Sequence, residues 1–179
     1  MYPSAQQEQI LARAFGCARR VYNDGLQARI EAFDAGLPYV DDAVLSRRVI
    51  TEAKRTAERR WLSEVSTAML QQALIDLNTG FRYFFASVAG RRPGRRFHRP
   101  RFRSAKDRRQ RIRFARNAKF RVLPNGRLRL PKIGDIEVRW SRPLPSDPTS
   151  VSVIKDRAGR YFASFVGPRD GAAVTPVCG

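Results

Sequence analysis

The sequence has few of the residues that most often build metal and redox sites. It contains one histidine, His98, and two cysteines, Cys17 and Cys178, which stand near opposite ends of the 179 residues. Structural zinc sites take four Cys or His ligands, and a disulfide framework needs several paired cysteines. We therefore expect no metal, no cofactor and no disulfide in this chain. Cys17 falls on the apolar side of a predicted helix, where we expect it to be buried and inert rather than catalytic.

The motifs of several enzyme classes are also missing. The sequence contains no glycine-rich phosphate loop, no Gly-x-Ser-x-Gly element and no histidine placed beside a nucleophilic Ser or Cys by a known motif. Its 16 carboxylates are scattered, and no two combine close spacing with an apolar setting that would split their pKa values. The sequence predicts that this chain is not an enzyme by itself. An intact nuclease built from several copies would need a metal-binding acidic cluster, which the sequence does not show.

Long apolar runs are absent as well. No run approaches the 18 residues of a membrane-spanning helix, and no basic-then-apolar signal opens the chain. These absences predict a soluble protein of a reducing, cytoplasmic compartment, with neither a membrane nor a small-molecule substrate as partner. The oligomeric state is left open.

Positive charge is what the sequence has in excess. Lys and Arg number 35 against 16 Asp and Glu, a formal net charge of +19. Between Arg91 and Arg121, 15 Lys or Arg stand against one acid, Asp107, so +14 lies in about a sixth of the chain. Such self-repulsion favours a polyanionic partner, and rings among the cations can stack on bases. The alternative is a solvated basic linker whose rings pack locally. The interleaved rings are Phe97, Phe102, Phe114 and Phe120.

Apolar residues at helical spacing predict a long first helix. It begins after Ser4, where Gln7 three residues later completes a capping box, and it ends near Asp34. Gly16 and Gly25 lie inside it, each at a cost of roughly 1 kcal/mol relative to alanine. Small residues at these positions allow a neighbouring helix to approach closely.

Two further amphipathic helices are predicted before the basic run. The second is capped by Asp41 or Asp42 and extends to about Trp61, and the third starts at Ser66. Three amphipathic helices with short connections predict a three-helix bundle.

Beyond the basic run, the apolar period changes to two. A Pro-Asn-Gly turn at residues 124–126 predicts one hairpin, residues 136–140 alternate next, and residues 151–155 and 160–166 predict a second hairpin. Five short antiparallel strands cannot bury both faces as a flat sheet, so we expect a small barrel. Residues 167–179 carry little pattern and predict a disordered tail.

The predicted fold class is therefore α+β. Its parts are a helical recognition domain at residues 1–90, a basic Arg-rich connector at 91–118, an antiparallel β-barrel domain at 119–166 and the tail at 167–179.

The amino-acid sequences of several segments resemble those of one known family. YPSAQQEQILARAFGCARRVYN at residues 2–23, WLSEVSTAMLQQALIDLNTGFRYFF at 61–85, PRFR at 100–103, GRLRLPKIGDIEVRW at 126–140 and VSVIKDRAGRYFASFV at 151–166 are similar, in this order, to TnpB (OrfB) proteins. These proteins are encoded by bacterial insertion sequences, are classed with the transposases and are related to type V CRISPR effectors.

The resemblance implies a function and a fold. Members of the family are similar to RNA-guided DNA endonucleases, so the chain is expected to bind guide-type RNA and a DNA motif beside the target, in a bacterial cytoplasm close to the nucleoid. The barrel would be the family's wedge domain, OB-like and incomplete at its first strand. The family's nuclease triad and four-cysteine zinc knuckle find no counterpart here, so we interpret the chain as a truncated N-terminal part. Divalent metal and zinc are expected only in the missing C-terminal part.

A second function class stays open beside this one. The chain could instead be an Arg-rich RNA-binding or scaffold protein that reads no DNA sequence. Such a scaffold needs only the charge, whereas ordered motifs over some 160 residues favour the transposase fragment.

Two groups of residues are predicted to touch nucleic acid. The first would hold phosphates or lie beside them: Arg91, Arg92, Arg95, Arg96, Arg99, Arg101, Arg103, Arg113, Arg116 and Asn117.

The second group is predicted to read bases. At 100° per residue, Thr67, Gln71 and Asn78 form an uncharged polar stripe beside the apolar face of the third helix, and Arg82 continues it. Gln and Asn can pair with adenine, and Thr can contact the thymine methyl group. The resemblance supports this role for Thr67 and Gln71, and Tyr39 is expected to stack or contact the backbone nearby. The alternative is an ordinary solvated helix flank.

Overall fold

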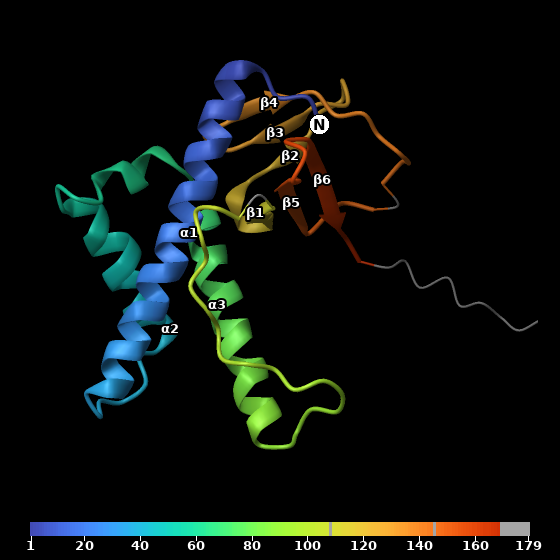
Figure 1. The fold of residues 1–179 in the computed structure, drawn as a ribbon. Helices are drawn as coiled ribbons and strands as arrows, with labels where there is room; N and C mark the ends of the chain where they lie inside the picture. The colour runs from blue at the N-terminus through green and yellow to red at the C-terminus, as the bar shows by residue number, and fades with distance from the viewer. Residues whose placement is uncertain (108, 145, 169–179) are drawn as a thin grey trace, which may run out of the picture.

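The computed structural model describes residues 1–107, 109–144 and 146–168. Residues 169–179, most of the tail predicted to be disordered, lie outside the described residues. The described chain is α+β, as predicted: two long helices cross, and two small antiparallel sheets pack beside one end of them (Figure 1). No helix in these ranges is long and apolar enough to cross a membrane.

The first helix, α1 (Ala5–Asp34), follows its sequence prediction closely. The Ser4 hydroxyl accepts a hydrogen bond from the Gln7 amide (3.3 Å), and the Gln7 side chain accepts one from the Ser4 amide (3.0 Å), so the capping box is confirmed. The helix ends in a turn at Gly36, whose φ of +66° favours glycine. Local capping chemistry therefore sets both ends of α1.

The predicted continuous second helix is wrong. After the cap at Asp41, α2 (Asp42–Ser46) gives way to a π-helical turn (Arg47–Glu52), a 3-10 turn (Ala53–Arg55) and, after a loop, another 3-10 turn (Arg60–Glu64). No residue between Ile50 and Leu62 is buried. Because helices in proteins depend on tertiary packing, this stretch has too little anchoring to continue.

The third helix, α3 (Thr67–Val88), packs against α1. A Cβ atom at Gly25 would lie 2.9 Å from Leu74 Cδ2 and 3.2 Å from Leu77 Cδ2, whereas nothing lies within 4 Å of one at Gly16. The predicted close helix approach is thus confirmed at Gly25 and wrong at Gly16. Since α2 has only five residues, the helical part is a crossed pair with a short third element rather than three equal helices.

Both predicted hairpins are confirmed, but the predicted barrel is wrong. In the described residues the strands form two separate antiparallel sheets, of order β1-β5-β6 and β2-β3-β4. The second sheet has strands of only two or three residues, too short to close around a core with the first. The strands are β1 (Gln110–Ala115), β2 (Arg121–Val122), β3 (Leu128–Leu130), β4 (Gly134–Ile136), β5 (Ser150–Lys155) and β6 (Tyr161–Val166).

The structure adds one strand that the sequence did not lead us to expect. β1 lies inside the range assigned to the basic connector, with Ile112 and Phe114 buried and arginines on its other side. The predicted segment 136–140, in contrast, contributes only Ile136 to a strand, followed by a bridge from Tyr2 to Glu137. β1 packs against α3, so the buried side chains of helices and sheets form one continuous core.

Candidate nucleic-acid interface

The segment from Arg91 to Asp107, which we call the arginine loop, leads from α3 to β1. It turns at Gly90 and Gly94, whose φ angles of +68° and +93° favour glycine. It then runs back beside α1 (Figure 1). The most basic part of the sequence is therefore laid along the helical pair.

Specific contacts fix the far end of this loop. The Asn23 side chain donates to the Arg103 carbonyl (3.0 Å) and accepts from the Arg103 amide (2.8 Å), as a strand neighbour would. The Arg103 guanidinium lies over the Tyr22 ring, 3.8 Å from its centroid, and 3.8 Å from Asp76. Arg103, predicted to hold phosphate, is thus committed to an internal contact.

Two more contacts hold the loop against α3. The Phe97 amide donates to the Ser87 hydroxyl (3.0 Å). A Cβ atom at Gly80 would lie 3.2 Å from Pro100 Cγ, so glycine leaves room for the loop to cross the helix. These contacts favour one arrangement of the loop before any partner binds.

The predicted phosphate-binding residues are not equivalent in the structure. Within the described ranges, Arg91, Arg95, Arg96 and Arg101 are exposed, and their side chains form no ion pair. Arg116 and Asn117 are exposed in a 3-10 turn after β1. Arg113, by contrast, points to Asp76 at 3.3 Å. Arg92 and Arg99 lie over aromatic rings, described below.

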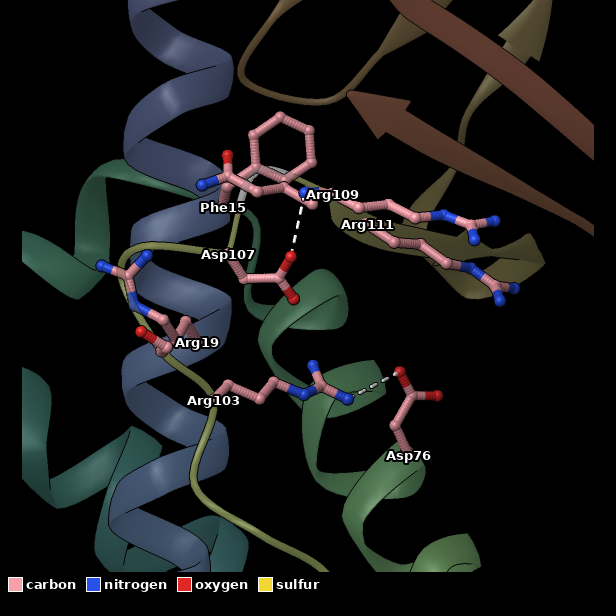
Figure 2. Close-up of a pocket in the computed structure, with 9 residues that line it drawn as sticks. Phe15, Arg19, Asp76, Arg103, Asp107, Arg109 and Arg111 are labelled. Atoms are coloured by element: carbon pink, nitrogen blue, oxygen red, sulfur yellow. Dashed lines mark hydrogen bonds and ion pairs between the residues drawn. The ribbon is translucent and has the colours of Figure 1, made fainter. Parts of the chain in front are cut away.

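A hollow between α1, α3 and the start of β1 adds basic residues that the sequence did not single out (Figure 2). Arg103 points toward Asp76 there, while the side chains of Arg109 and Arg111 extend together toward the sheet side (Figure 2). Arg111 donates to the Ser152 hydroxyl (3.0 and 3.2 Å). Arg19 comes from α1, so only the fold could bring these four arginines together.

The predicted base-reading stripe divides into two parts along α3. Thr67 and Gln71 are exposed near its start. The Thr67 hydroxyl accepts a hydrogen bond from Lys54 Nζ. Burial lowers the pKa of Lys54, and the positive charge of Lys132 lowers it further. Lys54 therefore lies at this end of the stripe, and because it comes from outside α3, the period of the helix could not have revealed it.

The other part of the stripe lies about 16 Å further along the helix, at 1.5 Å per residue. There Tyr39, Asn78 and Arg82 line one hollow with Phe81 and Phe85. The Tyr39 ring meets both phenylalanine rings edge-on, at 6.3 Å between centroids. The Asn78 Oδ1 atom is buried and has no hydrogen-bond partner in the described residues. An unsatisfied buried acceptor of this kind favours a ligand or water donor.

The four interleaved phenylalanines have different environments. Phe97 and Phe102 are exposed, Phe120 is half-buried and Phe114 is in the core. The prediction that all four can stack on bases is therefore wrong for Phe114. In the sequence, Ile112 and Phe114 alternate with arginines, and this alternation was the signal that could have predicted a buried Phe114 in a strand.

The remaining groups of interest are the Cys17 thiol and the carboxylates. Cys17 is buried, as predicted, and burial is the main cause that raises the pKa of its thiol to about 11. Among the described residues, no three His, Cys, Asp or Glu side chains gather as a metal site would require.

Residues 1–37 match a family model described as a helix-turn-helix domain, that of the OrfB proteins of IS605-type insertion sequences. In this structure the matched range holds one uninterrupted helix, α1, with short flanking segments. The match therefore identifies a segment, and the geometry of this segment is a single long helix.

Two curated proteins are similar over most of the chain. One from Streptomyces pristinaespiralis is 42% identical over 168 residues, which are 92% of this chain and 39% of that protein. InsQ from Escherichia coli K12 is 28% identical over 163 residues, 91% of this chain and 38% of InsQ. Both are named as candidate RNA-guided DNA endonucleases. The chain spans about two fifths of the length of these relatives.

Proposed function

Because the chain belongs to the OrfB (TnpB) family of insertion-sequence proteins, we propose that it is a nucleic-acid-binding part of an RNA-guided nuclease. Its partners are a guide-type RNA and a short DNA motif beside the target. The observation that carries this proposal is the arginine loop. Hydrogen bonds to α1 and α3 hold the loop in place, while Arg91, Arg95, Arg96 and Arg101 are exposed and form no ion pair with any described residue. Positive charge held in place in this way suits a phosphate backbone.

The two parts of the interface have different roles. The arginine loop, with Arg19 and Arg109 beside it, holds the backbone of RNA or DNA without regard to sequence. The exposed Gln71 and Thr67, flanked by Lys54, read base edges of the DNA motif while the lysine holds a neighbouring phosphate. Phosphate contacts then fix the register in which the bases are read.

We also propose that this chain binds without cutting. The scattered carboxylates of the described residues support this division, and so does the match to only two fifths of each relative. Divalent metal, zinc and the cutting step would then belong to the remaining part of the relatives.

The slope of affinity against salt tests the backbone role. Each phosphate contact on duplex DNA contributes about −0.9 to the slope of log K against log salt. Replacing Arg91, Arg95 and Arg96 by alanine should flatten the slope by about 2 to 3 units, measured by fluorescence anisotropy on duplex DNA and hairpin RNA.

The matched control removes three charges elsewhere. Arg55→Ala, Arg60→Ala and Arg157→Ala together lower the net charge by the same amount, from exposed positions outside the arginine loop. This variant should keep most of the slope. Equal flattening in both triple variants would mean that overall charge, and not this loop, binds the nucleic acid.

A further inference from the structure

An aromatic platform stands where α3 leads into the arginine loop. The Arg92 guanidinium lies 4.2 Å from the Tyr83 ring centroid and 4.5 Å from that of Phe97. The two rings are 5.4 Å apart and steeply inclined to one another. Each ring residue is 37% exposed, so solvent still reaches part of a surface that could be fully buried by a partner.

A second ring lies further along the loop. Phe33, at the end of α1, is 74% exposed, and the Arg99 guanidinium lies 5.6 Å from its ring centroid. An isolated exposed ring needs no explanation. Here, however, two arginines of one loop each lie over exposed rings, Arg92 over Tyr83 and Phe97 and Arg99 over Phe33.

Charge of one sign surrounds Tyr83, Phe97 and both arginines in the sequence, whereas Phe33 is next to Asp34. From residue 77 to 106, between Asp76 and Asp107, there are nine Lys or Arg and no Asp or Glu. Apolar protein partners are poorly matched to so much uncompensated charge. A ligand that carries flat apolar faces and regular negative charges is well matched, and a nucleic-acid strand with unpaired bases has both.

We propose that this end of the molecule is a binding track for unpaired nucleotides. Bases stack on the platform of Tyr83, Arg92 and Phe97 and on the Phe33–Arg99 pair, while Arg95 and Arg96 hold the phosphates between them. A duplex cannot use the track, because its bases already stack on one another. The inference rests on the proposed function and names, within it, single-stranded nucleic acid as the substrate class of this surface.

The track is tested with oligonucleotides that differ only in their bases. Binding of labelled (dT)12 is compared with binding of a 12-mer abasic strand that has the same phosphates, and with a blunt 12-base-pair duplex. Stacking contributes enough per base that Phe97→Ala should weaken (dT)12 binding by about fivefold to 150-fold. Phe33→Ala should weaken it in the same way. Neither change should alter binding of the abasic strand or the duplex.

Two further variants separate stacking from folding. Phe97→Tyr keeps a flat ring and should bind (dT)12 as well as the original, while Phe97→Leu keeps apolar bulk and should lose affinity as Phe97→Ala does. Phe162→Ala is the matched control, because Phe162 is 45% exposed and lies 5.7 Å from Arg160, whose charge Asp156 neutralises at 2.8 Å. It should change nothing.

The outcomes that overturn the track differ from those that overturn the proposed function. If Phe97→Ala weakens the abasic strand as much as (dT)12, the ring only shapes the loop and the track is wrong. If Phe97→Leu binds as well as Phe97→Tyr, stacking is wrong. If the original protein binds none of the three oligonucleotides, the proposed function itself fails.

Discussion

Asp76 determines how two of the predicted phosphate-binding residues behave. Its two carboxylate oxygens face Arg113 at 3.3 Å and Arg103 at 3.8 Å. Charge alone, read from the sequence, made these arginines equal to their neighbours. The ion pairs with Asp76 distinguish Arg103 and Arg113 from the other arginines. These two residues follow Asp76 by 27 and 37 positions, so the spacing of residues in the sequence could not predict the contacts.

Replacing Asp76 by Asn should release both arginines to bind phosphate. We expect tighter binding to random duplex DNA and a salt slope steeper by about 1 to 2 units, because two more cations become available. The melting temperature should fall, since the carboxylate also holds the loop. Glu58→Gln, which removes one charge from an exposed position, is the control. An unchanged slope for Asp76→Asn would show that the two arginines remain unavailable without it.

The proposed base reading by Gln71 is also a matter of a single residue, because it depends on one exposed side-chain amide. Gln71→Ala should cost roughly 1–3 kcal/mol on the preferred DNA and little on random duplex. Gln9→Ala, at an exposed glutamine of α1, should change neither. Competition binding against a randomised duplex library would identify the preferred DNA and measure both losses. Equal losses on specific and random DNA would instead fit the solvated-flank alternative, with α3 reading no bases.

At the scale of elements, local chemistry was sufficient in some places and insufficient in others. The Ser4–Gln7 capping box and the Pro-Asn-Gly hairpin were predictable because all their partners lie within a few residues. Strand β1 was not, because its exposed arginines resemble a linker unless the burial of Ile112 and Phe114 is known. The second helix failed for the converse reason: its pattern was helical, but too few of its residues reach the core.

The two glycines of α1 give a paired prediction about packing. Gly16→Ala should stabilise the protein by about 1 kcal/mol, because alanine favours the helix and nothing lies within 4 Å of the added carbon. That gain corresponds to a rise in melting temperature of about 2–4 °C.

Gly25→Ala makes the same helical gain but forces Leu74 and Leu77, both buried, to move. Overpacking costs about 1–3 kcal/mol, so the net effect should be between zero and about 2 kcal/mol of destabilisation. Thermal unfolding by circular dichroism measures both variants under one condition. Equal stabilisation by the two alanines would contradict the close approach of α1 and α3 at Gly25.

At the scale of the whole molecule, the division between binding and cutting can be tested directly. Purified protein with guide RNA and Mg²⁺, Mn²⁺ or Zn²⁺ should cut target DNA no faster than a buffer blank, because its carboxylates are dispersed or paired with arginines. The measurement is gel analysis of a labelled duplex over several hours. Cleavage that follows this protein through successive purification steps would contradict the proposal.

The continuous core has a consequence for how such proteins can be recombined. Side chains from α1 and α3 meet side chains from β1, β3 and β5 in one buried cluster. The end of the arginine loop lines a hollow between α1, α3 and the start of β1. The helices and sheets are therefore not interchangeable modules. A chimera that took its first 90 residues from one relative and the rest from another would inherit two halves of different interiors. Such exchanges should succeed only between relatives whose buried residues match across that boundary, however similar their surfaces are.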